Sequence, residues 1–227
     1  MKEEQLNYLA MISEAIVSNK YLEEILKLIV SMTAQLMGSK ICSIMLLDEN
    51  KNELVIAATQ SLSADYRNKP NIKVGQSVSG QALIKKEPVT VKDVRKHSGY
   101  MYPQIALKEG IVSMLAVPMK MKEKVIGVIN SYTDTPHQFT SQEISILQAV
   151  ANQAAAAIEN TRLRNEVLTA KKELEDRKKT EKAKGLLMQQ LNIGEKEAYD
   201  RIRKKAMNSR KTMVEIAEAL ILASEME

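Results

Sequence analysis

The chain has 227 residues, of which 44% are hydrophobic and 27% charged, and its formal net charge is +5. This composition excludes an intrinsically disordered protein, and the length allows one large domain or, better, two small ones. The sequence has no run of about 18 apolar residues, which excludes a membrane-spanning helix.

The cellular compartment follows from the N-terminus and the cysteine content. Residues 1–20 are acidic and amphipathic and lack the basic and apolar regions of a secretory signal. Cys42 is the single cysteine, so an internal disulfide is excluded and a reducing compartment is indicated. We therefore expect a cytoplasmic protein with no membrane partner. Because Cys42 lies among apolar residues, we expect it to be a small core residue.

Basic residues are concentrated towards the C-terminus. Up to Asn160 there are 17 basic and 16 acidic residues, whereas from Thr161 there are 16 basic and 12 acidic ones. A basic C-terminal part suits phosphate binding, although a solvated charged face is the commoner cause of such a pattern.

The first part of the chain predicts helices followed by hairpins. Apolar spacing indicates two helices over residues 1–37, with a break at Ser18-Asn19. Turn residues 48–52 join two short apolar runs, and turn residues 122–124 join two more, which predicts two β-hairpins. A short helix is expected over 77–85 and an extended run from Pro88. We expect the polar stretches 61–75 and 97–110 to be irregular.

These segments resemble a GAF domain. The resemblance rests on SIMLLD, GQSVSGQAL with EPVTVKDV, SMLAVPM, GVINSYT and QFTSQEISILQAVANQAAAAIEN, and it covers about residues 23–160. It implies an α+β fold in which helices flank an antiparallel sheet, and the element order agrees with that class independently. We assign residues 1–160 to a GAF-like sensor and dimerisation domain.

A long helix is expected to follow this domain. Thr140 and Glu143 form a capping box, and an apolar seam runs on past a phase break near Thr161 through Leu163, Val167, Ala170 and Leu174. No other element remains to cover the seam after Asn160. We therefore expect residues 161–180 to be a coiled-coil linker helix that joins two copies in a homodimer.

Gly185 is unusual because it stands inside a helical pattern. Glycine costs about 0.5–1 kcal/mol there relative to alanine, so it commonly marks a close approach by another group, either a neighbouring helix or a ligand such as nucleic acid. Further helices are predicted over 194–205 and from a second capping box at Thr212–Glu215. Tyr199, the one aromatic residue of this part, is expected to pack in the core.

The runs AKGLLM, EAYDRIRKKAM and TMVEIAEALI resemble an ANTAR domain, a three-helix RNA-binding module of bacterial antitermination regulators. We assign residues 181–227 to it. The resemblance and the basic positions together predict that RNA is contacted by nine residues: Lys182, Ala183, Lys184, Gly185, Arg201, Arg203, Lys204, Lys205 and Arg210.

Candidate ligand-binding residues lie in and near the long loops of the GAF-like part. They are Tyr66, Tyr100, Met101, Tyr102, Ser113 and Asn130. The sequence identifies no cofactor, and a domain without ligand that serves only dimerisation is an equal alternative. His97 and His137 lack metal-ligand spacing, so we expect solvated side chains, no metal site and no catalytic centre.

These observations favour a non-enzymatic transcription antitermination regulator. It would bind hairpin loops of nascent mRNA, while the GAF-like domain senses an unknown signal and mediates dimerisation. The alternative is a small-molecule sensor whose C-terminal helices dock onto a partner protein. A weaker third hypothesis is DNA binding through a helix-turn-helix at residues 192–194.

Overall fold

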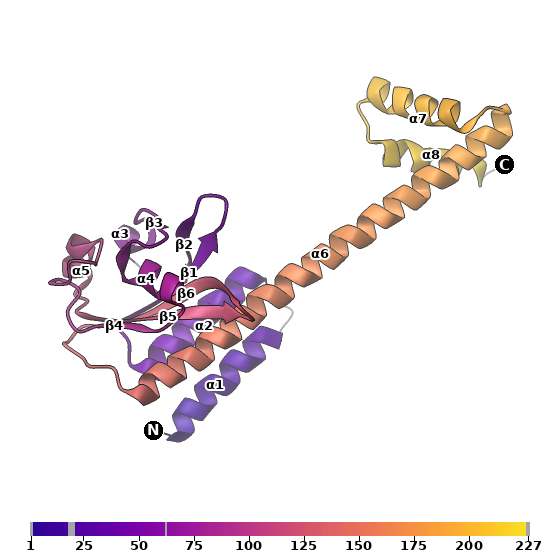
Figure 1. The fold of residues 1–227 in the computed structure, drawn as a ribbon. Coiled ribbons are helices and arrows are strands. Elements are labelled where there is room, and N and C mark those ends of the chain that lie inside the picture. Colours follow the sequence, from indigo (N-terminus) through magenta and orange to yellow (C-terminus); the bar gives the residue numbers. More distant parts are fainter. Residues whose placement is uncertain (1, 18–20, 62, 226–227) are drawn as a thin grey trace. The chain divides into compact units, whose positions relative to one another are not determined.

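The computed structural model describes residues 2–17, 21–61 and 63–225, which form two compact units, Met1–Thr161 and Arg162–Glu227 (Figure 1). The expected break at Ser18-Asn19 lies outside the described residues. The first unit combines an antiparallel sheet with helices, and the second is helical. The predicted α+β and all-α classes are confirmed.

A six-stranded sheet forms the centre of the first unit, with the order β3-β2-β1-β6-β5-β4 and antiparallel pairing throughout. Both predicted hairpins are present. In the first turn, Asp48 Oδ1 accepts hydrogen bonds from the backbone N–H groups of Asn50 and Lys51, which stabilises the reversal. The strands are β1 (Ile41–Asp48), β2 (Glu53–Thr59), β3 (Ile72–Lys73), β4 (Val89–Val91), β5 (Ser113–Met121) and β6 (Lys124–Thr133).

Three helices cover one face of the sheet: α1 (Lys2–Val17), α2 (Leu22–Met37) and the beginning of α6 (Ser141–Leu191) (Figure 1). Because side chains alternate along a strand, Ile44 and Ile129 point to this face and join Ile29 and Ala151 in a fully buried core. Burial of each of these isoleucine side chains contributes about 1.5–3 kcal/mol. Cys42 is buried in the same core, as expected.

Three shorter helices lie against the opposite face: α3 (Ala64–Arg67), α4 (Ser77–Lys85) and α5 (Pro103–Glu109) (Figure 1). They enclose a second core, which we call the loop-side core. Its fully or almost fully buried members include Met45, Tyr66, Val78, Met114 and Val128. The candidate ligand residues lie around this core.

The expectation of irregular structure over 61–75 and 97–110 is wrong, because these stretches contain α3 with β3 and α5. Local capping explains both helices. Ser63 Oγ accepts the backbone N–H of Tyr66 at 3.3 Å, so it caps α3. Pro103 opens α5, and Gly110 ends it in the left-handed conformation at φ 60°. Four- and seven-residue helices are too short to produce a helical periodicity.

Helix α6 begins at the predicted capping box, where Thr140 Oγ1 accepts the backbone N–H of Glu143 at 3.2 Å. It continues for 51 residues, through the phase break expected near Thr161. The sequence divides this stretch into a closing helix, a linker helix and the first helix of the C-terminal part. The structure joins all three, since no proline or capping residue interrupts the hydrogen-bond ladder.

The second unit adds α7 (Glu195–Ser209) and α8 (Met213–Ser224) to the end of α6. Among the described residues, its hydrophobic core is a cluster of five buried residues, and Ala198 of α7 is buried as well. The five-residue core consists of Ala183, Ile202, Ala206, Ile216 and Ala217. The predicted capping box of α8 is complete, because Thr212 Oγ1 accepts the N–H of Glu215 and the Glu215 carboxylate accepts the N–H of Thr212. Gly194 precedes α7 and supplies no side-chain cap.

Candidate nucleic-acid interface and candidate ligand site

The predicted RNA-binding residues at the end of α6 differ in exposure. Ala183 is fully buried in the five-residue core, so its side chain is a packing contact in this structure. Lys184 is 7% exposed, and its Nζ lies 2.9 Å from Glu181 Oε2 and 2.7 Å from Glu195 Oε1. The hydrogen bond that Lys184 donates to Glu195, followed by the one that it donates to Glu181, raises the pKa of Lys184. Lys184 therefore reaches a phosphate only by leaving two carboxylates.

Gly185 is exposed. Apart from its chain neighbours and the backbone of its own helix turn, no heavy atom of the described residues lies within 4 Å of the place where a Cβ would stand. The suggestion that a neighbouring helix approaches this glycine is therefore wrong for the described residues. Its open surface fits the other alternative, an external ligand.

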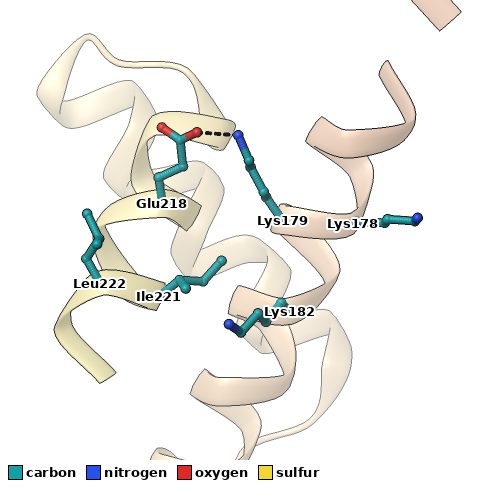
Figure 2. Close-up of a pocket in the computed structure, with 6 residues that line it drawn as sticks. All are labelled: Lys178, Lys179, Lys182, Glu218, Ile221 and Leu222. Carbon is teal, nitrogen blue, oxygen red and sulfur yellow. Dashed lines mark hydrogen bonds and ion pairs between the residues drawn. The ribbon is translucent and has the colours of Figure 1, made fainter. Parts of the chain in front are cut away.

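Two more lysines of α6 pair with carboxylates of α8. Lys179 Nζ lies 2.6 Å from Glu218 Oε1, and Lys182 Nζ lies 2.9 Å from Glu225 Oε1. Figure 2 shows the Lys179–Glu218 pair among the residues that line a cavity of about 470 Å³. In the same view, the Lys178 side chain points away from Glu218. The apolar side of the cavity comes from α8. The lining residues are Lys178, Lys179, Lys182, Glu218, Ile221 and Leu222.

Helix α7 carries the other predicted basic residues. Arg201 Nη2 lies 2.8 Å from Glu197 Oε1, one turn earlier on the same helix. The remaining four are exposed and, in the part of the chain that the structure describes, make no ion pair: Arg203, Lys204, Lys205 and Arg210. The nine predicted residues thus divide into intramolecularly paired cations, cations open to a ligand, and two without charge.

Tyr199 is 42% exposed, so the expectation that it packs in the core is wrong. The core face of α7 is occupied by Ala198, Ile202 and Ala206 at four-residue spacing, and Tyr199 lies at its margin. Arg203 follows Tyr199 by four residues and Met207, 70% exposed, follows by eight, so the three share one side of the helix. The sequence was misleading here because Tyr199 adjoins the apolar face of an amphipathic helix, and the helical pattern alone does not show where burial ends.

In the first unit, Tyr66 and Asn130 meet in one hydrogen-bonded network. Ser79 Oγ donates to Asn130 Oδ1 at 3.0 Å, Asn130 Nδ2 donates to Ser43 Oγ at 3.5 Å, and Ser43 Oγ lies 2.9 Å from the Tyr66 hydroxyl. Sequence reasoning missed Ser43 and Ser79. Strand alternation could have found Ser43, because it shares a sheet face with Met45 and is paired with Asn130 across the sheet.

Two tyrosines extend the network. Tyr132 is 1% exposed, and its ring meets that of Tyr66 edge to face at 6.0 Å between centroids. Tyr100 is buried beside Tyr132, and burial raises the pKa of both hydroxyls. Met101 and Tyr102 are half-buried at the edge of this core, where the Tyr102 hydroxyl donates to Pro70 O at 2.8 Å.

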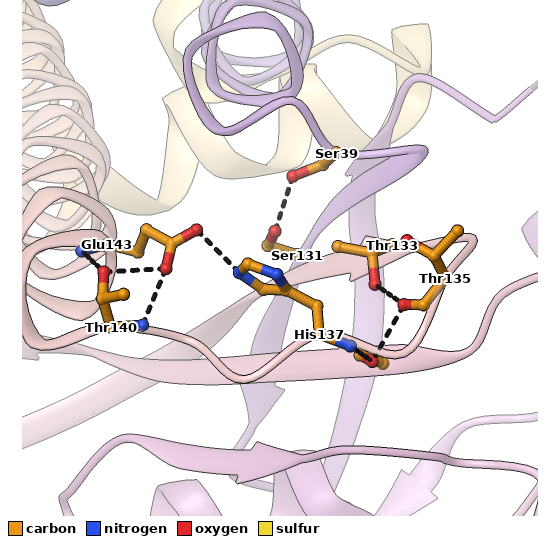
Figure 3. Close-up of polar contacts among 8 residues, drawn as sticks. Ser39, Ser131, Thr133, Thr135, His137, Thr140 and Glu143 are labelled. Carbon is orange, nitrogen blue, oxygen red and sulfur yellow. Dashed lines mark hydrogen bonds and ion pairs between the residues drawn. The ribbon is translucent and has the colours of Figure 1, made fainter.

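Ser113 lies away from the network and holds the segment before α6. Its Oγ lies 2.7 Å from Lys92 O and accepts the backbone N–H of His137 at 2.7 Å. Figure 3 shows His137 next to the capping box, with Nε2 2.8 Å from Glu143 Oε1. Burial alone would raise the pKa of Glu143, but hydrogen bonds from Thr140 and His137 lower it. His97 is exposed as expected, whereas His137 is half-buried and partnered.

Two family models match the chain. The GAF domain model matches residues 20–159, and the ANTAR domain model matches residues 169–221. The chain belongs to the GAF–ANTAR regulators. The two matches confirm the resemblances inferred from the sequence motifs. Both domains are regulatory and not enzymatic.

Among curated proteins, the phosphoenolpyruvate-dependent phosphotransferase systems of Escherichia coli and Salmonella typhimurium are 25% and 24% identical over 158 residues. The match covers 70% of this chain but only 21% of each relative. It is therefore a match to one part of a much longer protein.

Solved structures match the first unit in fold. The GAF domain of a Coxiella burnetii phosphoenolpyruvate-protein phosphotransferase has a TM-score of 0.66 at 24% identity, covering 72% of this chain and 98% of that one. Free methionine-R-sulfoxide reductase from Neisseria meningitidis has a TM-score of 0.61 at 23% identity, covering 70% and 91%. Among the described residues of the present chain, no helix combines the length and hydrophobicity needed to cross a membrane.

Proposed function

We propose that this GAF–ANTAR protein is a non-enzymatic transcription antitermination regulator that binds hairpin loops of nascent mRNA in the cytoplasm. The observation that carries the proposal is the set of exposed cations on and just after α7, Arg203, Lys204, Lys205 and Arg210, which have no carboxylate partner among the described residues. Phosphate contacts require such cations.

The open side of Gly185 supports the same surface, because a helix without a side chain at that point admits a base or a sugar closely. Tyr199 supplies an exposed ring for a loop base. Sequence-specific RNA recognition uses unpaired bases stacked on aromatic side chains. The proposed interface therefore joins Gly185, Tyr199 and the four partnerless cations, with Lys182, Lys184 and Arg201 available once their carboxylates are displaced.

The proposal is tested by gel-shift titration of the full chain with a tandem hairpin RNA, a scrambled hairpin and duplex DNA at two salt concentrations. We expect tight, salt-sensitive binding to the tandem hairpin. Binding to the duplex alone would favour the helix-turn-helix hypothesis. Binding to none of the three would favour the alternative, a sensor whose C-terminal helices dock onto a partner protein.

Two arginines of α7 provide a matched pair. Arg203→Gln and Arg201→Gln each remove one charge from the same helix, but Arg201 is already paired with Glu197. We expect Arg203→Gln to lower the salt slope of RNA binding by about one and to weaken affinity by about 1–2 kcal/mol. The effect of Arg201→Gln should be clearly smaller. Equal effects would show that pairing with a carboxylate of the same chain does not decide which arginine contacts RNA.

We further propose that two copies associate through α6. Leu163, Val167 and Leu174 repeat at coiled-coil spacing and are 47–65% exposed in the single chain. A second copy would cover them and give two RNA-binding units on one body, which adds avidity where both can engage. Val167→Glu should shift the mass measured by sedimentation from dimer to monomer, whereas Glu173→Gln should not.

A small-molecule signal is proposed for the first unit. The network around Tyr66 and Asn130 stands where the sheet meets α3 and α4, and its hydrogen-bonding groups could be re-partnered by a ligand. Met101 and Tyr102 lie at the edge of that region. Ser113 contacts the segment before α6, so its role would be to couple this unit to the helix.

A further inference from the structure

The loop-side core contains a charge that the protein does not neutralise. Lys69 is 8% exposed, although lysine is almost never buried without a partner. Its Nζ lies 4.1 Å from the centroid of the Tyr66 ring, and Tyr66 is itself fully buried. Within residues 2–17, 21–61 and 63–225, Lys69 Nζ has no carboxylate at ion-pair distance and no hydrogen-bond acceptor.

One carboxylate that shares a cavity with Lys69 is engaged elsewhere. Asp65 lines that cavity, but its Oδ2 lies 2.7 Å from Lys108 Nζ on α5. The contact with the Tyr66 ring is attractive. Among the described residues, no buried side-chain nitrogen or oxygen lacks a hydrogen-bond partner, so the Lys69 ammonium, which has none, still reaches solvent. An anion that enters from solvent can therefore pair with it.

Lys69 also lines an opening large enough for a small molecule. A cavity of about 340 Å³ lies between α3 and α5, within the usual range for ligand pockets. Asn68 and Gln104 place amide groups on its wall, and these can donate hydrogen bonds to an anion. The lining residues are Ala64, Asp65, Asn68, Lys69, Pro70, Gln104, Ile105 and Lys108.

We propose that this cavity binds a small organic anion whose carboxylate or phosphate group pairs with the Lys69 ammonium. The inference rests on the sensing role proposed above for the first unit and gives its ligand a chemical class. The anion would neutralise Lys69 and accept hydrogen bonds from Asn68 and Gln104. Tyr66 is fully buried and does not line the cavity, so the anion would act on the Ser43–Asn130–Ser79 network through Lys69, which packs on the Tyr66 ring. Occupancy would thereby be communicated to strands β1 and β6 at the centre of the sheet.

The test uses the full chain with inorganic phosphate, succinate and glutamate at constant ionic strength, and with succinamide as the uncharged counterpart of succinate. Two readouts are available. One is the thermal midpoint of the first unit, and the other is tyrosine fluorescence, which is usable because the chain has no tryptophan. A response to phosphate would indicate a phosphate-bearing ligand, and a response to succinate or glutamate would indicate a carboxylate ligand.

We expect at least one anion to raise the midpoint of the wild type and to change its tyrosine fluorescence, while succinamide does neither. Lys69→Met should weaken that binding about tenfold or more, as expected for a lost charge-assisted hydrogen bond. Lys69→Arg should restore part of it. Lys85→Met removes an exposed lysine of the same unit and should leave binding unchanged.

A measurement without added anion distinguishes a ligand-binding role of Lys69 from a purely structural one. Lys69 makes no ion pair among the described residues, so Lys69→Met without added anion should keep a midpoint close to that of Lys85→Met, whereas replacing a structural lysine would lower the midpoint. The inference is overturned if none of the three anions acts on the wild type, or if they act equally on Lys69→Met. Gel shifts on the same preparations are independent: loss of RNA binding with anion binding retained would refute only the antitermination proposal.

Discussion

The two units place their polar groups under opposite conditions. In the first, Ser43, Ser79, Asn130 and Tyr66 form neutral hydrogen bonds inside a large core. In the second, a five-residue core is surrounded by lysine–glutamate pairs at the surface. Buried neutral networks fix one arrangement, whereas exposed ion pairs are weak and exchange readily with salt or phosphate. The first unit is thus suited to recognising a small ligand, and the second to yielding its charges to a large polyanion.

The largest effect should come from the small core. Ile202 is 1% exposed and is the more deeply buried of the two isoleucines in the five-residue core. Ile202→Ala should destabilise the second unit by about 3 kcal/mol, because so small a core cannot collapse around the cavity. Calorimetry of the full chain should show the transition of the second unit moving to lower temperature. If both transitions moved together, the two units would not melt independently.

Gly127→Ala is the corresponding change in the first unit. A Cβ at Gly127 would collide with the Met45 carbonyl oxygen and approach Met119 Cε within 2.6 Å. Because backbone on the central strand β1 must then move, we expect a loss of about 2 kcal/mol in the first unit alone. Gly194→Ala, where a Cβ meets open space in the second unit, is the control and should leave the midpoint of the first unit unchanged.

Tyr199→Ala tests whether the exposed ring of α7 is functional. One stacked base is worth about 1–3 kcal/mol, so we expect RNA affinity to fall about tenfold, with the thermal midpoint unchanged. Tyr199→Phe keeps the ring and should bind nearly as well as the wild type. A loss of affinity in both variants would assign the effect to the hydroxyl and not to stacking.

Glu218→Gln tests whether the surface pairs compete with RNA. The change frees Lys179 from its 2.6 Å contact, and we expect RNA affinity to rise about two- to threefold at low salt. Glu173→Gln removes the same charge from an exposed position of α6 and controls for net charge. An equal gain in RNA affinity in both variants would show that the effect comes from long-range electrostatic attraction between the protein and RNA, and not from the release of Lys179.

The smallest effect concerns pH. The hydrogen bond from Lys184 lowers the pKa of Glu195 below its ordinary value of 4.5. A carboxylate with a depressed pKa contributes stability that is present above the unfolded pKa and is lost as pH falls through the folded one. The midpoint of the second unit should therefore decline in acid below 4.5, and less so in Glu195→Gln. The same slope in both would mean that the pair is not formed in solution.

Sequence reasoning predicted the features that repeat or that follow fixed local chemistry. The hairpins follow from alternation and turn residues, and both capping boxes follow from their four-residue signatures. Short helices such as α3 and α5 escaped because capping, and not periodicity, specifies them. The two family resemblances located the units.

The pairing of charged groups could not be predicted. Whether Lys184 meets solvent or Glu195 depends on how α6 and α7 pack, and no local pattern encodes that. The same holds for Lys69, whose burial depends on where the chain after α3 crosses the loop-side core. The exposure of Tyr199 was mispredicted for a related reason, because an amphipathic helix does not show how far its apolar face extends beyond a small core.

The reactivity of the buried Cys42 thiol can serve as a measure of whether the first unit is folded. Burial raises the pKa of this group, so the reactive thiolate is scarcely formed while the first unit is folded. A thiol-specific reagent would then modify the chain at the rate at which that unit opens, and with a single cysteine the readout has one source. Oxidants should likewise leave Cys42 of the folded protein unmodified, so peroxide is not a signal that the protein could register through this thiol.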